Sequence, residues 1–127
     1  LLKISPDLEA DNLKYLCEKV LSSNIDGLII SNTTISRDLI STDTLEKGGL
    51  SGKPIFDIST KQLRMAYKYT NGKIPLIGVG GVDSAEKAYE KIKNGASLIQ
   101  LYTGFIYEGP KLVRDINMAI LKKNIVH

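Results

Sequence analysis

The sequence predicts a parallel α/β fold, and three observations carry that prediction. Four short Leu/Ile-rich runs recur along the 127 residues. Each run is nearly continuous rather than alternating, which is typical of strands covered on both faces. A segment of helical periodicity follows each run, so the order is strand then helix, four times, and right-handed crossovers make the strands parallel. The runs are residues 1–5, 27–31, 75–79 and 97–102.

The first predicted helix follows the run at residues 1–5. Asp7 and Asp11 are acidic residues suited to its amino-terminal region, and Asn24 is its expected end. Its apolar face repeats at helical spacing. That face consists of Leu13, Leu16, Cys17, Val20 and Leu21.

The second predicted helix begins at Ser59, which forms a capping-box pattern with Gln62 three residues later. The Asn71-Gly72 pair is expected to end it. The residues expected on its inner face are Leu63, Ala66, Tyr67 and Thr70.

The third predicted helix has a second capping-box pattern, Asp83 with Glu86, and is expected to stop at Gly95. The fourth has Pro110 at its first helical position, where a missing N–H costs least. The inner faces are expected to be Ala85, Ala88, Tyr89 and Ile92 in the third helix, and Leu112, Val113, Ile116, Ala119 and Ile120 in the fourth.

Four such units form either half of a (β/α)8 barrel or a small doubly wound sheet. A full barrel takes about 250 residues, roughly twice this length. The chain opens inside an apolar segment at Leu1 without an initiator Met. We therefore expect a piece of a longer protein.

Composition argues against several classes of protein. The net charge is +3, with Lys scattered among acids, so nucleic-acid binding is not indicated. Cys17 is the only cysteine, which excludes an internal disulfide, and we expect it to be buried. The only histidine is His127. No apolar run approaches the roughly 20 residues of a membrane span, and no signal-peptide pattern is present.

Residues 32–58 form a long segment without a helical period. Segments of this length inside compact domains are usually lids or binding loops. It contains Gly48-Gly49-Leu50-Ser51-Gly52, and glycines at this density suit the close approach of backbone to a ligand. We prefer this ligand interpretation over a flexible insertion.

Polar residues and glycines gather just past three of the strands, at the edge where parallel α/β folds bind ligands. Gly80-Gly81 matters most, because backbone N–H groups there can approach an anion without obstruction from Cβ. If the last two strands are the seventh and eighth of a barrel, they build that fold's common phosphate site. The clusters are Asn32-Thr33-Thr34, Gly80-Gly81 and Thr103-Gly104.

Lys3 lies inside the first apolar run. A lysine at this point either reaches outward to solvent or meets a negative partner. Pointing into a barrel mouth, it could neutralise an electron-rich cofactor atom. The sequence alone leaves these alternatives even.

Five stretches, taken together, resemble class 2 dihydroorotate dehydrogenases. They are residues 2–8, 25–34, 48–54, 74–82 and 95–104, in the family's order and over nearly the whole chain. The class rests on Asn32-Thr33-Thr34 and Gln100-Leu101-Tyr102-Thr103, where class 1 relatives usually differ. The resemblance implies the carboxyl-terminal half of a (β/α)8 TIM barrel, about four βα units, with residues 1–127 as part of one FMN-binding domain.

The family oxidises dihydroorotate to orotate, a step of pyrimidine synthesis, using FMN and then quinone. The resemblance places Lys3 near the N1/C2 edge of the flavin, where a cation tunes the cofactor. It places Ser31 beside the flavin and assigns Asn32 and Thr33 to the orotate side. The residues it implies for FMN are Lys3, Ser31, Ser51 and Gly52, with Gly80, Gly81, Tyr102 and Thr103 at the phosphate.

The family's catalytic base, a serine in class 2, belongs to the earlier half of the barrel, so the resemblance implies no catalytic residue in this chain. We expect the isolated chain to be inactive and to leave sheet edges open. Peripheral association with a membrane is implied for the complete protein, at the mitochondrial inner membrane in a eukaryote or the inner membrane in a bacterium. Another FMN or sugar-phosphate barrel enzyme, or a non-catalytic phosphate-binding module, remains an alternative.

Overall fold

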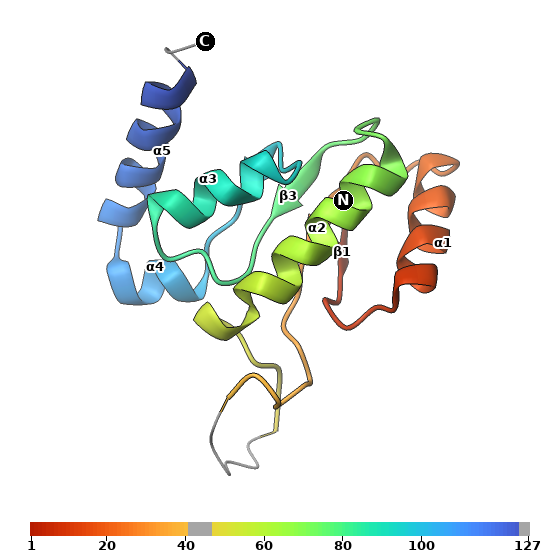
Figure 1. Ribbon diagram of the computed structural model, residues 1–127, viewed down its shortest axis with the longest axis horizontal. Coiled ribbons are helices and arrows are strands. Elements are labelled where there is room, and N and C mark those ends of the chain that lie inside the picture. Colours follow the sequence, from red (N-terminus) through yellow and green to blue (C-terminus); the bar gives the residue numbers. More distant parts are fainter. Residues whose placement is uncertain (41–46, 125–127) are drawn as a thin grey trace.

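The computed structural model describes residues 1–40 and 47–124. Four short strands form one parallel sheet in the order β1-β2-β3-β4. They are β1 (Leu2–Ile4), β2 (Leu28–Ile30), β3 (Leu76–Gly78) and β4 (Leu98–Ile99). The helices are α1 (Ala10–Leu21), η1 (Lys53–Ile55), α2 (Phe56–Thr70), α3 (Ala85–Lys93), α4 (Thr103–Glu108) and α5 (Lys111–Asn124). Figure 1 shows α2 in front of β1 and β3, with α1 and α3 on either side.

The strand order decides between the two architectures that the sequence left open. Each strand pairs with the next one along the chain, and the order never reverses, whereas a doubly wound sheet reverses at a switch point. Successive right-handed crossovers in one direction place the helices on the same side of the sheet. The predicted α/β fold with four parallel βα units is confirmed, and its progression is that of a barrel.

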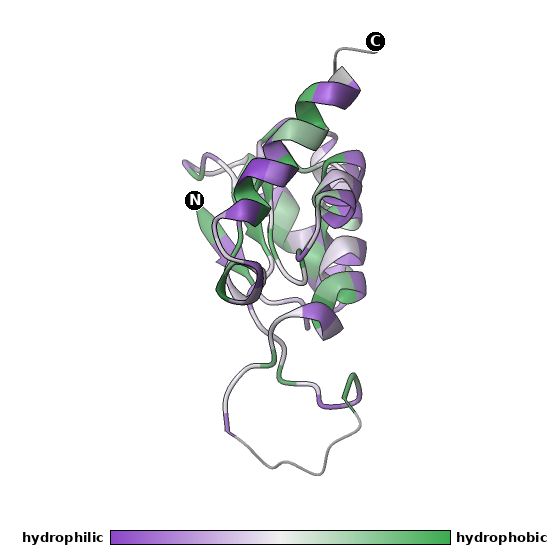
Figure 2. Cartoon of the chain, turned by 90° about the vertical axis from the view of Figure 1, so that its left-hand side faces the viewer, coloured by the Kyte–Doolittle hydropathy of each residue, from purple (hydrophilic) through white to green (hydrophobic). Residues whose placement is uncertain are grey.

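The core lies between the helices and one face of the sheet. Strand residues such as Ile4, Leu28 and Leu76 pack there against Leu13 of α1 and Leu63 of α2. Helices α1 and α2, which cover this face, also pack against each other. In Figure 2 the strands are green and the helices alternate between green and purple, as amphipathic helices over an apolar sheet do.

The opposite face of the sheet carries a row of residues in register. Lys3, Ile29, Ile77 and Leu98 stand side by side across the four strands. Leu98 is 61% exposed, because helices cover the other face. We expected strands buried on both faces, and the described residues bury only one. In a closed barrel this second face is the packed interior.

Three predicted helix starts were wrong, those of α2, α3 and α5. Helix α2 begins at Phe56, three residues before Ser59, because the turn at η1 leads the chain into the helix earlier. Ser59 is therefore buried inside α2, and Gln62 donates from Nε2 to the carbonyls of Pro6 and Leu8 instead of capping the helix. At α3 the cap is Ser84, whose hydroxyl accepts from the Lys87 amide at 3.3 Å, and not Asp83.

The ends of the helices agree more closely with the sequence. Asn71 closes α2 in the left-handed conformation (φ 51°), as predicted. Helix α1 ends at Leu21, before Asn24, and α3 ends at Lys93, before Gly95. Pro110 lies one residue before α5 rather than at its first position.

Cys17 is fully buried in the core, as predicted. Burial, with a smaller contribution from Glu18, raises the pKa of its thiol to about 11. It is therefore a small apolar core residue at neutral pH. Among the described helices, none has both the length and the apolar character that crossing a bilayer requires.

Candidate functional site

A cavity of about 260 Å³ opens at the carboxyl ends of the strands. The ten residues that the sequence singled out for cofactor or substrate all line it. They are Lys3, Ser31, Asn32, Thr33, Ser51, Gly52, Gly80, Gly81, Tyr102 and Thr103. They are contributed by all four strand ends and by the long segment before α2, so only the folded sheet brings them together.

Lys3 belongs to β1 and stands in the row of the uncovered sheet face, beside Ile29. Its side chain lines the cavity while remaining exposed in this chain. Of the two alternatives for this lysine, the structure places it at the mouth of the cavity. It supplies positive charge there.

Ser31, Asn32 and Thr33 follow β2. Ser31 is 2% exposed, and its hydroxyl donates to the Asn32 carbonyl at 3.0 Å. The Asn32 amide donates to the Ile4 carbonyl at 2.7 Å, and its side-chain Oδ1 accepts from the Thr33 amide at 2.9 Å. The peptide bond between Ile30 and Ser31 is cis. Asn32 and Thr33 both line the cavity, and the Oδ1 of Asn32 is already engaged by the Thr33 amide.

Thr34, the third residue of this cluster, points elsewhere. It is fully buried, and its hydroxyl donates to the Asp7 carboxylate. Burial acts to raise the pKa of Asp7, but hydrogen bonds from Thr34, the Ile35 amide and Ser5 outweigh it and lower that pKa. Thr34 therefore anchors the segment after β2 to the β1–α1 connection. The bridge of Thr34 to Leu50 brings the two ends of the long segment together.

Ser51 and Gly52 enter from the far end of the long segment. The Thr103 hydroxyl donates to the Ser51 hydroxyl at 2.9 Å. Gly52 has φ 78°, and a Cβ there would meet the Thr103 methyl at 3.1 Å. The segment before α2 is therefore held against the end of β4.

Gly80 and Gly81 follow β3 with φ 105° and 72°. A Cβ on Gly80 would meet the Ser59 hydroxyl at 2.9 Å, and one on Gly81 would meet the Phe56 backbone at 2.6 Å. Within the described parts of the chain, neither glycine amide donates a hydrogen bond to another protein group. Two free backbone N–H groups in a tightly packed turn are suited to an anion.

Helix α4 begins at Thr103 and was not predicted from the sequence. It is six residues long, and Phe105, Ile106 and Tyr107 are all partly to largely exposed. A helix without a buried face produces no periodic apolar pattern. Its position after β4 is that of the short extra helix that completes many barrel phosphate sites.

Two charged groups near the cavity were also missed. Asp83 pairs with Lys53 at 3.3 Å and Lys87 at 3.0 Å; burial alone would raise its pKa, and the two lysines lower it. Lys91 of α3 is 0% exposed, behind Gly80. Burial lowers the pKa of Lys91 to about 7, although Glu90 and Asp57 oppose this. Lys91 lies three residues after the buried Ala88, so the helical period places it on the inner face of α3. Because lysine is rarely buried, its residue type predicted exposure instead.

No cluster of His, Cys, Asp or Glu that could hold a metal ion occurs in the part of the chain that the structure describes. The residues that line the cavity offer backbone amides, hydroxyls, the side-chain amides of Asn32 and Gln100, and the ammonium of Lys3. These groups bind an anion together with a polar planar ring.

The comparisons with known proteins agree in their assignment. The family model described as dihydroorotate dehydrogenase matches residues 1–123. The chain is 54% identical over 125 residues to dihydroorotate dehydrogenase (quinone), mitochondrial, from Arabidopsis thaliana, covering 96% of this chain and 27% of that relative. It is 52% identical over 126 residues to dihydroorotate dehydrogenase (quinone) from Christiangramia forsetii, covering 98% of this chain and 37% of the relative.

A crystal structure of DHODH from Eimeria tenella in complex with ferulenol superposes with a TM-score of 0.88 at 38% identity. The match covers 96% of this chain and 33% of that one. The chain thus spans about a third of the length of the proteins that it matches.

Proposed function

The chain belongs to the dihydroorotate dehydrogenase family, in its quinone-dependent class 2, and from this premise we propose that its cavity is the FMN phosphate site and part of the orotate site of such an enzyme. In the complete protein the reaction is the oxidation of dihydroorotate to orotate, with quinone as the electron acceptor. Residues 1–127 are part of its single FMN-binding domain.

The observation that carries this proposal is the convergence of ten residues from five separate segments on one cavity. A cavity that arose only from packing would not gather this set of free amides, hydroxyls and one lysine. Gly80 and Gly81 are the residues of this set most specific for a phosphate, because Ser59 and Phe56 occupy the space that a Cβ would need there.

FMN supplies the electron-accepting group when it is bound. Gly80, Gly81, Tyr102 and Thr103 hold its phosphate, and Ser51 and Gly52 contact it from the long segment. Lys3 places a positive charge at the cavity mouth, and Ser31 lies beside the ring.

Asn32 and Thr33 orient the pyrimidine, because an amide offers a donor and an acceptor side by side. We assign no general base to any residue of this chain, since Ser51 and the other hydroxyls belong to the cofactor side. The proposal includes membrane association of the complete protein. It also includes a mitochondrial location in a eukaryotic source, as the name of the Arabidopsis relative states for that protein.

The test is an FMN titration, followed by quenching of flavin fluorescence, on the natural protein in its full length. Gly81→Ala should weaken binding at least about tenfold, because the new Cβ displaces the backbone that faces the phosphate. Gly109→Ala is the matched control, since Gly109 also has a positive φ (69°) but its Cβ would meet nothing within 4 Å.

Absence of FMN binding by the unaltered protein would overturn the proposal. FMN binding without any response to added orotate would favour another FMN barrel enzyme. Binding of inorganic phosphate without flavin would leave a phosphate-binding module.

A further inference from the structure

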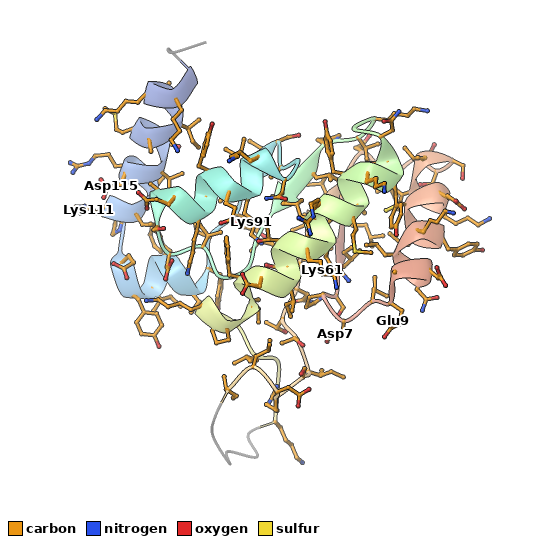
Figure 3. All side chains as sticks on the ribbon, viewed as in Figure 1. Asp7, Glu9, Lys61, Lys91, Lys111 and Asp115 are labelled. Atoms are coloured by element: carbon orange, nitrogen blue, oxygen red, sulfur yellow. The ribbon has the colours of Figure 1, made fainter. Side chains whose placement is uncertain are left out.

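Lys91 is the largest fully buried side chain of the described residues. It extends from α3 into the space between α3 and α2 (Figure 3). Its Nζ donates to the Ser59 hydroxyl at 2.5 Å and to the Val79 carbonyl at 3.4 Å. No carboxylate of the described residues lies within ion-pair distance of it. Such a charge is costly to bury, so its retention calls for a function.

The hydrogen bonds of Lys91 lead to the turn that holds the two glycines. The Ser59 hydroxyl accepts the hydrogen bond from the ammonium, and its own proton lies within reach of the Phe56 carbonyl at 3.0 Å and of the Gly80 carbonyl at 3.2 Å. Lys91 therefore shares the Val79 carbonyl with the Ser31 amide, which donates to it at 3.1 Å, and reaches the Gly80 carbonyl through Ser59.

Because the peptide bond is planar, the direction of the Val79 and Gly80 carbonyls fixes the direction of the Gly80 and Gly81 amides. In a trans peptide the C=O of one residue and the N–H of the next point in opposite directions. The Val79–Gly80 and Gly80–Gly81 peptides are trans. Carbonyls turned inward toward Lys91 and Ser59 therefore turn the amides of Gly80 and Gly81 outward, on the cavity side.

We propose that Lys91 is the positioning residue of the phosphate cradle: from behind the turn it fixes the Gly80 and Gly81 amides toward the anion and adds a buried positive charge to the site. This inference rests on the proposed function, because it takes FMN phosphate as the anion. Lys91 does not contact the ligand. It acts through Ser59 and the backbone.

The surroundings of Lys91 make its effect depend on pH. Burial lowers its pKa to about 7, and the charges that favour the protonated form are Glu90 beside it on α3 and Asp57 on α2. Lys87 and Lys91 both approach the Phe56 ring. Lys87 also pairs with Asp83, as Lys53 does. A bound phosphate favours the charged ammonium, so binding above pH 7 draws a proton. Affinity for FMN should fall as pH rises from 7 to 9, whereas riboflavin, which lacks the phosphate, should not show this fall.

The experiment compares FMN with riboflavin on the natural protein in its full length. Lys91→Met keeps the volume and removes the charge. It should weaken FMN binding at pH 7 at least about tenfold, as expected for losing a hydrogen bond from a charged group, and leave riboflavin within about twofold. The pH dependence of FMN affinity should disappear in the same variant.

Two further variants complete the test. Lys93→Met removes the same charge from the exposed end of α3 and should bind both flavins as the unaltered protein does. Ser59→Ala should reproduce the selective loss for FMN, and it replaces Lys91→Met if that variant does not fold.

Equal weakening of FMN and riboflavin in both variants would show a merely structural lysine and overturn the inference, as would unchanged FMN binding. Failure of the unaltered protein to bind any flavin would instead overturn the proposed function, so the two failures are distinguishable.

Discussion

The hydroxyl of Thr103 donates a 2.9 Å hydrogen bond to the hydroxyl of Ser51 across 52 positions of sequence. It joins the first residue of α4 to the long segment that follows β2. Because both residues line the cavity, this bond sets the distance between two of its walls. Gly52, next to Ser51, leaves room for the Thr103 methyl.

Thr103→Ala should weaken FMN binding by roughly five- to tenfold, since it removes one hydroxyl from the phosphate side and releases Ser51. Thr103→Ser keeps the donor and should restore most of the affinity. A double-mutant cycle with Ser51→Ala, measured by flavin quenching, should give a coupling energy of about 1 kcal/mol. Additive losses would mean that the two hydroxyls act independently.

Asn32→Ala should impair orotate binding and spare FMN. The side-chain amide faces the cavity, and its Oδ1 also fixes the Thr33 amide, so truncation removes a donor–acceptor pair from the pyrimidine side. The loss for orotate should be about tenfold or more. It is measured by orotate titration of the FMN-loaded protein. An equal loss of FMN affinity would place Asn32 on the cofactor side instead.

Lys91→Met should change how stability depends on pH. The pKa of Lys91 is about 7 in the folded chain and 10.5 as its ordinary value, so between these values the unfolded chain holds a proton that the folded chain releases. Stability of the unaltered protein therefore gains from this group as pH rises through that window.

The free energy of unfolding of the unaltered protein should rise relative to that of the methionine variant by at most about 1.4 kcal/mol per pH unit above pH 7, and the difference should level off below pH 7. Urea denaturation of both proteins between pH 6.5 and 9.5 measures the difference. A difference that stays constant with pH would contradict the assignment.

Gln62→Leu should destabilise the fold by about 1 to 3 kcal/mol. Its Nε2 donates to the Pro6 and Leu8 carbonyls at 3.0 and 2.9 Å, and both lose their partner in the variant. Its Oε1 has no hydrogen-bond partner among the residues that the structure describes, so the loss of stability comes from the two donated hydrogen bonds. Gln62→Glu, which also lacks the donors, should lose at least as much. Thermal or urea unfolding measures both, with the exposed Lys61→Leu as the control beside it (Figure 3).

The strands and most of the helices were predictable, because the pattern that determines each of them lies within a few neighbouring residues. Continuous Leu/Ile runs gave four strands, helical spacing gave α1, α2, α3 and α5, and Asn71-Gly72 gave the end of α2. The ten candidate site residues were predicted from strand ends and from the family resemblance, and the structure gathers them at one cavity. Their roles toward FMN and orotate stay predictions.

Tertiary structure alone decided what several polar residues do. Ser59 and Gln62 have the spacing of a capping box, yet they lie inside α2 because the Gly80 carbonyl and the β1–α1 connection arrive beside them. Asp83 caps nothing, because Lys53 reaches it from a segment 30 positions away. Lys91 is buried because the Val79 carbonyl and the Ser59 hydroxyl accept its hydrogen bonds. Periodicity records which face of an element is apolar, whereas the partner of a polar group is fixed only when distant segments meet.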